Sequence, residues 1–552
     1  MTRLLIYIFL LISVSNSYGQ VWKWAEQGLG VNIDGDDHGN DIVTDSNGNS
    51  YVTGYFEDTI TFGAFTLITP TATIQQSDFD IFITKYDPNG NVLWAKQAGG
   101  IGWDEGYGIS IDNYGNCYVT GAFTDTAYFE SDTVYSNNTS DVFIAKYSTN
   151  GNFQWVKQIN GSTGYNQGQS ITNDIFGNIY VTGEFLDTLT IDAFVLNGGK
   201  IFIAKFDSIG NAIWVNQMGK NNWSPPRPTV SGIGIDENSN SYITGYFADT
   251  LFFSSDTLIA SGITDIFIAK YDSLGNIQWA KKAGGATNFY DTSSDIVVSG
   301  KGSLYIVGSF NGVAIFDSVS ITSSGFTDIF VSKWSKDGDI IWAKKAGGVN
   351  DDFGWGIELN FDGNLYVTGR FADSSFFDTI SLFSQNSIDL YVANYDTLGN
   401  VKYAVQSAGS SASDWFGGFS ISSDNFGNVY LTGIFQGSAM FGSIPITSTG
   451  YDDILVAKIG PLGNAIQDLL KFKDYKIYPN PTSQRATLEF NNSRQESHTL
   501  TLYDTQGRMI KKMTNIKTDK ITIEKENFPP GLYFFQLFNG NQVIFTGKLI
   551  IK

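Results

Sequence analysis

The stretch G-N-C-Y-V-T-G-A-F at residues 115–123 is one copy of a phrase that occurs seven times along the chain. Its general form is G-N-x-Y-V-T-G-x-F, and neighbouring copies lie 61 to 67 residues apart. A period this steady predicts stacked copies of one supersecondary unit rather than seven independent segments. The second glycine of each copy marks the series: Gly54, Gly121, Gly183, Gly245, Gly308, Gly369 and Gly433.

Each phrase lies inside a longer unit that predicts four short strands. In the second unit, G-I-S-I-D, C-Y-V-T-G-A-F, D-V-F-I-A-K-Y and F-Q-W-V-K-Q each alternate with period two and are separated by turns rich in Asn and Gly. This is the hairpin pattern. Four-stranded meanders repeated around an axis make a β-propeller. We therefore expect an all-β protein with a seven-bladed propeller over residues 20–467.

The turns inside the units repeat as well. In D-S-N-G-N, which begins at Asp45, the Asp can bond backbone N–H groups two residues on, and the Gly supplies a positive φ. The oxygen spacing also resembles the start of a calcium loop, but the Gly is misplaced and no bidentate Glu follows. Turn chemistry is the preferred interpretation, so no cofactor is expected, with Ca²⁺ kept as the alternative.

The sequence also indicates how the ring closes. Trp24 stands near the start of the chain in a W-A context typical of a fourth strand, with no first, second or third strand before it. The seventh unit lacks a fourth-strand aromatic, whereas the other six have one. We expect the N-terminal strand to complete the last blade. The six aromatics are Trp94, Trp155, Trp214, Trp279, Trp342 and Tyr403.

The charge is divided unevenly along the chain. From Asp468 onward there are 13 basic and 8 acidic residues, whereas the remainder has 21 basic and 47 acidic residues. An acidic repeat region argues against nucleic acid or anionic lipid as a partner. Cys117 is the single cysteine, so no intramolecular disulfide can form.

Residues 1–19 resemble a secretory signal peptide. Arg3 gives a basic start, residues 4–14 are apolar but too short to span a bilayer, and small residues precede Gln20. We expect cleavage before Gln20 and passage through the periplasm. No later segment reads as transmembrane.

The repeated phrases G-N-x-Y-V-T-G, D-I-F-x-A-K-Y-D and G-N-x-x-W-A resemble those of the bacterial seven-bladed β-propeller (SBBP-type) repeat family. The resemblance covers about residues 22–467. It implies the propeller fold but no single activity, since propellers serve as binding modules and as enzymes.

The sequence pattern changes after a linker expected at residues 468–475. I-Y-P-N-P, L-Y-D-T-Q-G-R, P-P-G-L-Y-F-F-Q-L and G-K-L-I-I-K follow in order and predict a small β-sandwich at 476–552. The order resembles the C-terminal sorting domain of Bacteroidota proteins exported by the type IX secretion system. This implies that machinery as a partner and a secreted or outer-surface location. The implied motif residues are Tyr478, Pro479, Asn480, Pro481, Tyr503, Gly507, Gly531, Tyr533, Gly547 and Lys548.

Function is expected where the repeats differ, in the loops that join each fourth strand to the next first strand. These loops carry aromatic rings beside carboxylates and amides, which suits sugars and protein hot spots. The competing interpretation is that the recurring part of this pattern serves the fold. The ligand-binding candidates are Trp103, Asp104, Tyr165, Trp223, Tyr290, Asp291, Asp352, Trp355, Asp414 and Trp415.

Enzyme chemistry has little support in the sequence. His38 is the only histidine before the tail, because the other one is His498, and no nucleophile motif accompanies it. We expect no catalytic residue and no metal ligand. The prediction is an exported binding or surface-scaffold propeller whose ligand is a glycan or a protein. A carbohydrate-active enzyme, either glycosidase or lyase, is the first alternative, and a purely structural surface component is the second.

Overall fold

The computed structural model describes residues 20–30, 35–70, 78–137, 139–219, 226–254, 256–286, 289–409, 416–461, 475–490, 492, 495–503, 509–525, 528–539 and 542–552. All regular elements in these ranges are β-strands, so the all-β expectation is confirmed. The chain divides into two compact units, Met1–Pro461 and Leu462–Lys552. The expected signal peptide at 1–19 and residues 468–474 of the expected linker lie outside the described residues.

Unit 1 consists of antiparallel meanders in which successive strands pair. One repeat forms the sheet β17 (Thr229–Ile235), β18 (Ser241–Phe247), β21 (Asp265–Tyr271) and β22 (Ile277–Ala283). Six further sets follow the same order, and in the last of them the fourth strand comes from the start of the chain. These sets are β2 (His38–Thr44), β3 (Ser50–Glu57), β6 (Phe79–Tyr86) and β7 (Val92–Gly100); β8 (Glu105–Ile111), β9 (Cys117–Phe123), β12 (Asp141–Tyr147) and the first half of β13 (Phe153–Asn173); the second half of β13, β14 (Ile179–Ile191), β15 (Phe194–Phe206) and β16 (Ala212–Met218); β23 (Thr292–Val298), β24 (Leu304–Phe316), β25 (Val319–Trp334) and β26 (Ile340–Ala346); β27 (Phe353–Leu359), β28 (Leu365–Phe377), β29 (Ile380–Tyr395) and β30 (Val401–Gln406); and β32 (Phe416–Ser423), β33 (Val429–Phe435), β36 (Asp453–Pro461) and β1 (Gln20–Gly30).

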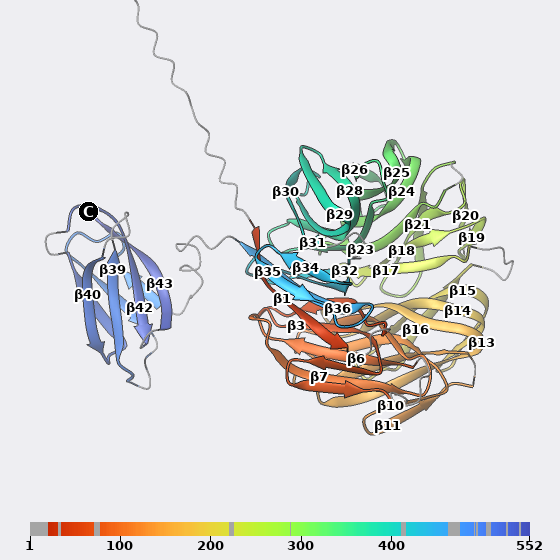
Figure 1. Cartoon of the computed structure of the whole chain (residues 1–552), viewed down its shortest axis with the longest axis horizontal. Helices are drawn as coiled ribbons and strands as arrows, with labels where there is room; N and C mark the ends of the chain where they lie inside the picture. The colour runs from red at the N-terminus through yellow and green to blue at the C-terminus, as the bar shows by residue number, and fades with distance from the viewer. Residues whose placement is uncertain are drawn as a thin grey trace, which may run out of the picture. The chain divides into compact units, whose positions relative to one another are not determined.

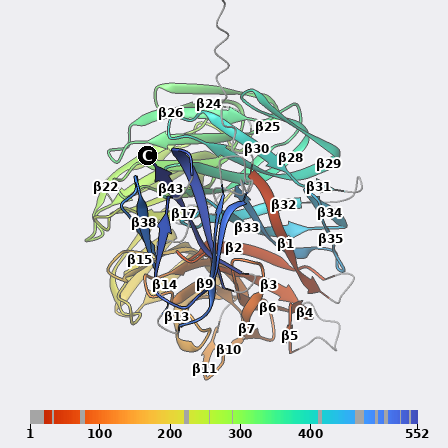
Figure 2. The ribbon, with the colours of Figure 1, turned by 90° about the vertical axis from the view of Figure 1, so that its left-hand side faces the viewer.

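Strand β1 pairs with the far end of unit 1. Its residues from Gln20 to Gly28 run antiparallel to β36, and Leu29 and Gly30 continue against β4 (Thr59–Phe62). Figure 1 shows β1, in red, beside β36, in blue, and Figure 2 shows the same neighbourhood from the side. The two ends of the repeat region are therefore joined by backbone hydrogen bonds.

The first strands of the repeats lie next to one another in chain order. Contacts run from β2 to β8, then to β13, β17, β23, β27 and β32, and β32 contacts β2 again. All seven first strands therefore face one common interior.

A small hairpin stands between the second and third strands of each repeat. Each hairpin bonds to the fourth strand of the preceding sheet, as Ala127 does to Gly100, or to the residues that directly follow that strand. Because a covered edge cannot pair with another chain, these hairpins protect the outer strands. They are β4 with β5 (Phe65–Ile68), β10 (Thr126–Phe129) with β11 (Asp132–Tyr135), β19 (Thr250–Phe252) with β20 (Thr257–Ile259), β34 (Ser438–Phe441) with β35 (Ile444–Thr447), and the extended ends of β14–β15, β24–β25 and β28–β29; β34 bonds to β31 (Ala408–Gly409).

The fourth-strand tryptophans connect neighbouring sheets. The Trp94 indole N–H donates to the carbonyl oxygen of Thr149 at 3.2 Å, in the turn before the next sheet's fourth strand. Trp214, Trp279 and Trp342 make the equivalent bond. In β1, Trp24 donates to the carbonyl oxygen of Pro88 at 3.1 Å and is buried.

The turns form as the sequence predicted. Oδ1 of Asp45 accepts from the N–H groups of Asn47 and Asn49, both at 2.9 Å, and the Asn49 amide donates to Oδ2 at 2.7 Å. Gly48 has a φ of 84°, which a side chain would disfavour. The same bonds recur at Asp87, Asp112, Asp174, Asp207, Asp236, Asp272, Asp396 and Asp424.

Unit 2 has two sheets around one core. The first sheet is β37 (Tyr475–Tyr478), β38 (Arg485–Phe490) and β41 (Lys520–Glu524); the second is β40 (Met509–Ile516), β39 (His498–Tyr503), β42 (Gly531–Asn539) and β43 (Gln542–Ile551). Leu488 from the first sheet and Leu502 and Phe535 from the second are buried in the same cluster. The arrangement is the expected small sandwich.

The sorting-motif residues of unit 2 join its two ends. The Asn480 side-chain amide donates to the carbonyl oxygen of Lys548 at 2.8 Å, and its Oδ1 accepts from the N–H of Ile550 at 2.8 Å. The first motif is therefore fixed to the last strand. Gly507 lies outside the described residues.

Candidate functional site

Every first strand of unit 1 contains a β-bulge at an equivalent position. In β2, Gly39 pairs with Gly54 and Asp41 pairs with Thr53, so Asn40 has no partner across the ladder. A bulge of this kind turns a side chain away from the regular alternation. The seven bulged residues are Asn40, Tyr107, Gln169, Ser231, Ser294, Trp355 and Phe419.

The repeated second glycine faces each bulge. A Cβ on Gly121 would collide with the carbonyl oxygen of Glu105, two residues before bulged Tyr107, and the same holds in all seven repeats. Since that oxygen belongs to the backbone, it cannot move aside as a side chain can. The glycine of the repeated phrase is therefore what allows the bulge.

All seven bulged side chains line one cavity of about 470 Å³. Its other lining residues lie beside them on the first strands, apart from Tyr55 on β3. The volume is within the range of small-molecule sites, roughly 300–1,000 Å³. One position of the repeat, different in chemistry from copy to copy, thus forms a ring around this cavity.

Aromatic rings make up one part of the wall. Trp355 contacts Phe419 edge to face, with centroids 5.1 Å apart, and stacks on Phe353 at 6.1 Å. The Arg370 guanidinium lies 5.2 Å from the Trp355 ring. These contacts hold the half-buried Trp355 indole in place at the cavity.

Amide and hydroxyl groups make up the rest of the wall formed by the bulged residues. The Asn40 amide donates to the carbonyl oxygen of Gly106 at 2.8 Å, and the Ser231 hydroxyl donates to the carbonyl oxygen of Ser293 at 2.7 Å. The Tyr107 hydroxyl donates to the carboxylate of Glu105. Amides and hydroxyls have further donor or acceptor capacity beyond these bonds.

Two carboxylates lie next to the bulged residues. Asp41 accepts from the N–H of Ile109 at 2.8 Å and from the Ser420 hydroxyl at 2.6 Å. Asp295 accepts from the N–H groups of Ile296 and Ile357, at 2.7 and 3.0 Å. Burial raises the pKa of Asp41 to about 6 and that of Asp295 to about 8.

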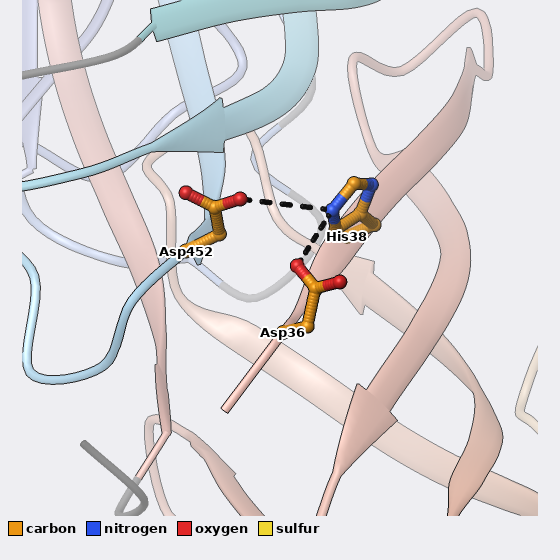
Figure 3. Close-up of side chains that lie close together, drawn as sticks. All are labelled: Asp36, His38 and Asp452. Atoms are coloured by element: carbon orange, nitrogen blue, oxygen red, sulfur yellow. Dashed lines mark hydrogen bonds and ion pairs between the residues drawn. The ribbon is translucent and has the colours of Figure 1, made fainter. Parts of the chain in front are cut away.

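Asp36, His38 and Asp452 meet where the first and last repeats adjoin (Figure 3). Nε2 of His38 lies 3.0 Å from Oδ1 of Asp36 and 3.9 Å from Oδ2 of Asp452. The hydrogen bond with His38 lowers the pKa of Asp36, whereas burial raises the pKa of Asp452 to about 6. The His38 ring also stacks on Tyr55 at 4.7 Å.

The predicted aromatic candidates fall into two groups. Trp355 lines the cavity, whereas Trp103 and Tyr290 lie just before first strands, Tyr165 lies within β13, and all three are about half exposed. Trp223, Asp414 and Trp415 lie outside the described residues.

The predicted carboxylates Asp104, Asp291 and Asp352 are fully buried. Asp104 accepts from the N–H of Gly100 at 2.7 Å and from that of Thr124 at 2.9 Å, and the other two make equivalent bonds. Burial raises their pKa values, to about 7, 7 and 8. These contacts fix the loop to the end of the second strand, and a binding role for the three residues stays a prediction.

Six of the seven ring residues were not among the sequence candidates. A signal that marks four of the seven ring residues is the variable residue of a G-x-G or G-x-S triplet in the first strand, namely G-Y-G at 106–108, G-Q-S at 168–170, G-W-G at 354–356 and G-F-S at 418–420. Small flanking residues around a variable one are typical of a bulge.

Unit 1 is a repeat protein whose first strands surround one cavity, and it is followed by a separate C-terminal unit. Residues 23–55 and 154–184 match the family model of the β-propeller repeat, and residues 476–552 match that of the secretion system C-terminal sorting domain. Both suspected modules are thereby confirmed. The sorting domain indicates export to the cell surface or secretion, by way of the type IX machinery.

Two curated proteins and a solved structure are similar to this chain. An uncharacterized WD repeat-containing protein, L264, of Acanthamoeba polyphaga mimivirus is 25% identical over 505 residues, covering 75% of this chain and 36% of its own length. Regulatory protein FlaEY of Caulobacter vibrioides is 28% identical over 143 residues, 25% of this chain and 15% of its own length. The chain thus spans about a third or less of these relatives. The calcium-binding protein regucalcin of Agrobacterium tumefaciens has 9% identity and a TM-score of 0.29, over 64% of this chain and 88% of its own.

No helix long and apolar enough to cross a bilayer occurs among the residues that the structure describes.

Proposed function

We propose that this protein is an exported glycan-binding propeller that holds a sugar unit in the cavity formed by its seven bulged residues. The observation that carries the proposal is the convergence of all seven on one space of about 470 Å³. They are the positions at which the repeats differ in chemistry while the surrounding backbone repeats.

The chemistry of the ring suits a sugar. Trp355 and Phe419 offer apolar faces to C–H groups, and Asn40, Gln169 and Ser294 offer amide and hydroxyl groups to sugar hydroxyls. Glu105, Asp41 and Asp295 add acceptors, and no Lys or Arg stands among the described lining residues. A neutral, polyhydroxylated ligand fits this wall better than an anionic one. A protein ligand would instead use the exposed side chains of Trp103, Tyr165 and Tyr290.

The proposed architecture is a seven-bladed propeller closed by β1. The pairing of β1 with β36 supports it, as does the return contact from β32 to β2. Trp24 donates to Pro88 as Trp94 donates to Thr149, and the indoles lie against Gly90 and Gly151 in the same way. A strand from the N-terminus thus makes the contacts of an ordinary fourth strand.

A glycan array followed by calorimetry on the full chain tests the binding proposal. The double variant Trp355→Ala/Gln169→Ala should weaken binding of an array hit at least about tenfold, because it removes a stacking face and an amide. The rim variant Trp103→Ala/Tyr290→Ala should have a smaller effect. The turn variant Asn89→Ala should have none.

Melting curves must accompany the titrations, so that loss of binding is separated from loss of fold. Unchanged affinity in a folded ring variant would place the ligand elsewhere. If only the rim variant loses binding, the exposed loops form the site. If no glycan binds to the wild-type chain, the protein-ligand and purely structural alternatives remain.

Cleavage of the bound glycan is the second candidate, favoured by the raised pKa of Asp295, about 8, which would keep this group protonated at neutral pH as a general acid requires. Its two oxygens, however, already accept backbone N–H groups. Release of new reducing ends from a bound glycan, abolished in Asp295→Asn, would establish cleavage. Binding without such release would exclude it for that glycan.

A further inference from the structure

We propose that Asp36, His38 and Asp452 form a binding site for a first-row divalent metal ion of the Zn²⁺ or Mn²⁺ type, at the junction between the first and last repeats. The proposal does not depend on sugar binding. One ligand atom from each residue lies within 4.8 Å of the others.

The backbone brings these three residues together. Asp36 and His38 are two positions apart in extended chain, so their side chains point to the same side. Asp36 and Asp452 are partners in a parallel bridge, and the N–H of Asp37 donates to the carbonyl oxygen of Asp452 at 3.1 Å. The three side chains therefore converge from two segments that the closure of unit 1 brings side by side (Figure 3).

One oxygen of the Asp452 carboxylate has no hydrogen-bond partner among the described residues, and the other faces Asp36 and His38. It is 7% exposed, and within the described part of the chain its Oδ1 has no hydrogen-bond partner. Its Oδ2 is aimed at His38, at 3.9 Å, which is longer than a hydrogen bond. A buried carboxylate oxygen without a partner is costly, and a bound cation would lower that cost.

The negative charge is concentrated at this junction. Asp37 and Asp453 adjoin Asp36 and Asp452 in the sequence and are buried, whereas His38 is the only basic group in the metal-ligand cluster. A divalent ion would compensate two carboxylates that otherwise face each other.

The equivalent positions at other junctions do not carry this set. The corresponding parallel bridges are Phe79 with Trp103 and Thr264 with Tyr290, neither of which offers a carboxylate. The positions that match His38 there hold Glu105 and Thr292. The repeat fold therefore forms without the three ligands, and their presence at one junction needs another explanation.

The donor set favours the class of ion. One imidazole nitrogen with two carboxylate oxygens suits Zn²⁺ or Mn²⁺ better than Mg²⁺ or Ca²⁺, which prefer oxygen alone. Three protein ligands leave coordination positions for water or for a ligand group, as in open metal sites. His38 also lines the cavity of the bulged residues, so the ion would lie at its edge.

Co²⁺ is a spectroscopic probe for such a site. Chelator-treated full-length protein should bind one Co²⁺ with visible d–d absorption, and Zn²⁺ should displace it. His38→Gln and Asp452→Asn should each weaken Co²⁺ binding at least about tenfold, since loss even of residues that support a ligand costs 10–100-fold. Zn²⁺ should raise the melting temperature of the wild type but not of these variants.

Two matched controls distinguish the site from non-specific binding. Asp351→Asn changes the residue that stands at the position of Asp36 at another junction, and His498→Gln removes the only other histidine. Both should bind Co²⁺ as the wild type does. The proposal is overturned if the wild type takes up no Co²⁺ or Zn²⁺ by mass-spectrometric metal content. It is equally overturned if folded His38→Gln, checked by circular dichroism, binds as well as the wild type, which would leave an ordinary Asp–His ion pair.

Discussion

The fourth strands of the repeats keep the same side chain, whereas the first strands keep the same backbone geometry and vary the side chain. At the fourth strand, Trp94 and Trp214 make the same indole hydrogen bond to the next sheet, and Trp24 makes it across the junction of the chain's two ends. At the bulge of the first strand, the backbone repeats but the side chain changes from Asn40 to Tyr107. Contacts between sheets thus depend on constant side chains. The cavity depends on constant backbone with variable side chains.

This difference separates stability from recognition within one repeat. The glycine opposite each bulge belongs to the constant part, because without it the bulge could not form. The bulged residue can vary, because its side chain points into the cavity rather than into the core. Substitution of the glycine should therefore reduce stability. Substitution of the bulged residue should reduce binding and leave stability almost unchanged.

The largest effect is expected at the constant glycine. Gly121→Val places a Cβ against the carbonyl oxygen of Glu105 and should cost more than about 4 kcal/mol or prevent folding. Chemical denaturation measures the loss. Gly300→Ala is the control, because the nearest side-chain atom lies 3.5 Å from the added Cβ, and it should change the free energy of unfolding by less than about 0.5 kcal/mol. Equal stability of the two variants would contradict the proposed role of the glycine.

A smaller but substantial loss is expected at the tryptophan of β1. Trp24→Ala should lower the free energy of unfolding by about 3–5 kcal/mol, as should Trp94→Ala, if both serve one purpose. Deleting residues 20–28 should open the ring and expose the edge of β36. Trp103→Ala, at a residue 49% exposed, serves as the comparison and should have little effect on melting. An unchanged melting temperature in both the deletion and Trp24→Ala would reject closure by β1.

The buried carboxylates of the loops should make stability depend on pH. Burial raises the pKa of Asp352 to about 8 and that of Asp291 to about 7, from a usual 3.8. Between about pH 4 and 8 the folded protein retains protons that the unfolded chain has released, so the free energy of unfolding should fall as pH rises. Denaturation at pH 5 and pH 8 measures the slope. Asp352→Asn should make it shallower, and a slope unchanged by this variant would mean that Asp352 is ionised in the folded protein.

The smallest effect on stability is expected at the seven bulged residues that line the cavity. Gln169→Ala removes a half-buried side chain that points into the cavity, so the free energy of unfolding should change by less than about 0.5 kcal/mol. A loss of more than about 2 kcal/mol would show that the bulged residues help to hold the fold, and the separation drawn above would fail.

The fold was largely readable because its determinants are local. The D-x-x-G-N turns and the alternating strands depend on residues a few positions apart, and the motifs of the tail stand in one order along the chain. The pairing of β1 could be inferred as well, since Trp24 stands in a fourth-strand context without its three predecessors.

The site was harder to read because register is not visible in a sequence. Without the register shift beside Gly39, Asn40 appears as an ordinary strand residue. Asp104 appears as an available ligand, because its bonds to the N–H groups of Gly100 and Thr124 cannot be seen. Trp355 was found because an indole in a variable position draws notice by itself. Asp452 was missed because its partners Asp36 and His38 lie more than 400 positions away in the chain.

The pairing of β1 with β36 also has a consequence for the order in which contacts form during folding. The amide of Gln27 donates to the carbonyl oxygen of Thr447, a partner 420 residues further along the chain. Closing a loop of that length costs roughly 5 kcal/mol of chain entropy before the contact gives anything back. In a chain made from its N-terminus, residues 20–28 of β1 cannot pair with β36 until almost all of unit 1 has been synthesised. The pairing of β1 with β36 is therefore among the last long-range contacts of unit 1 that can form, and contacts of such sequence separation form slowly.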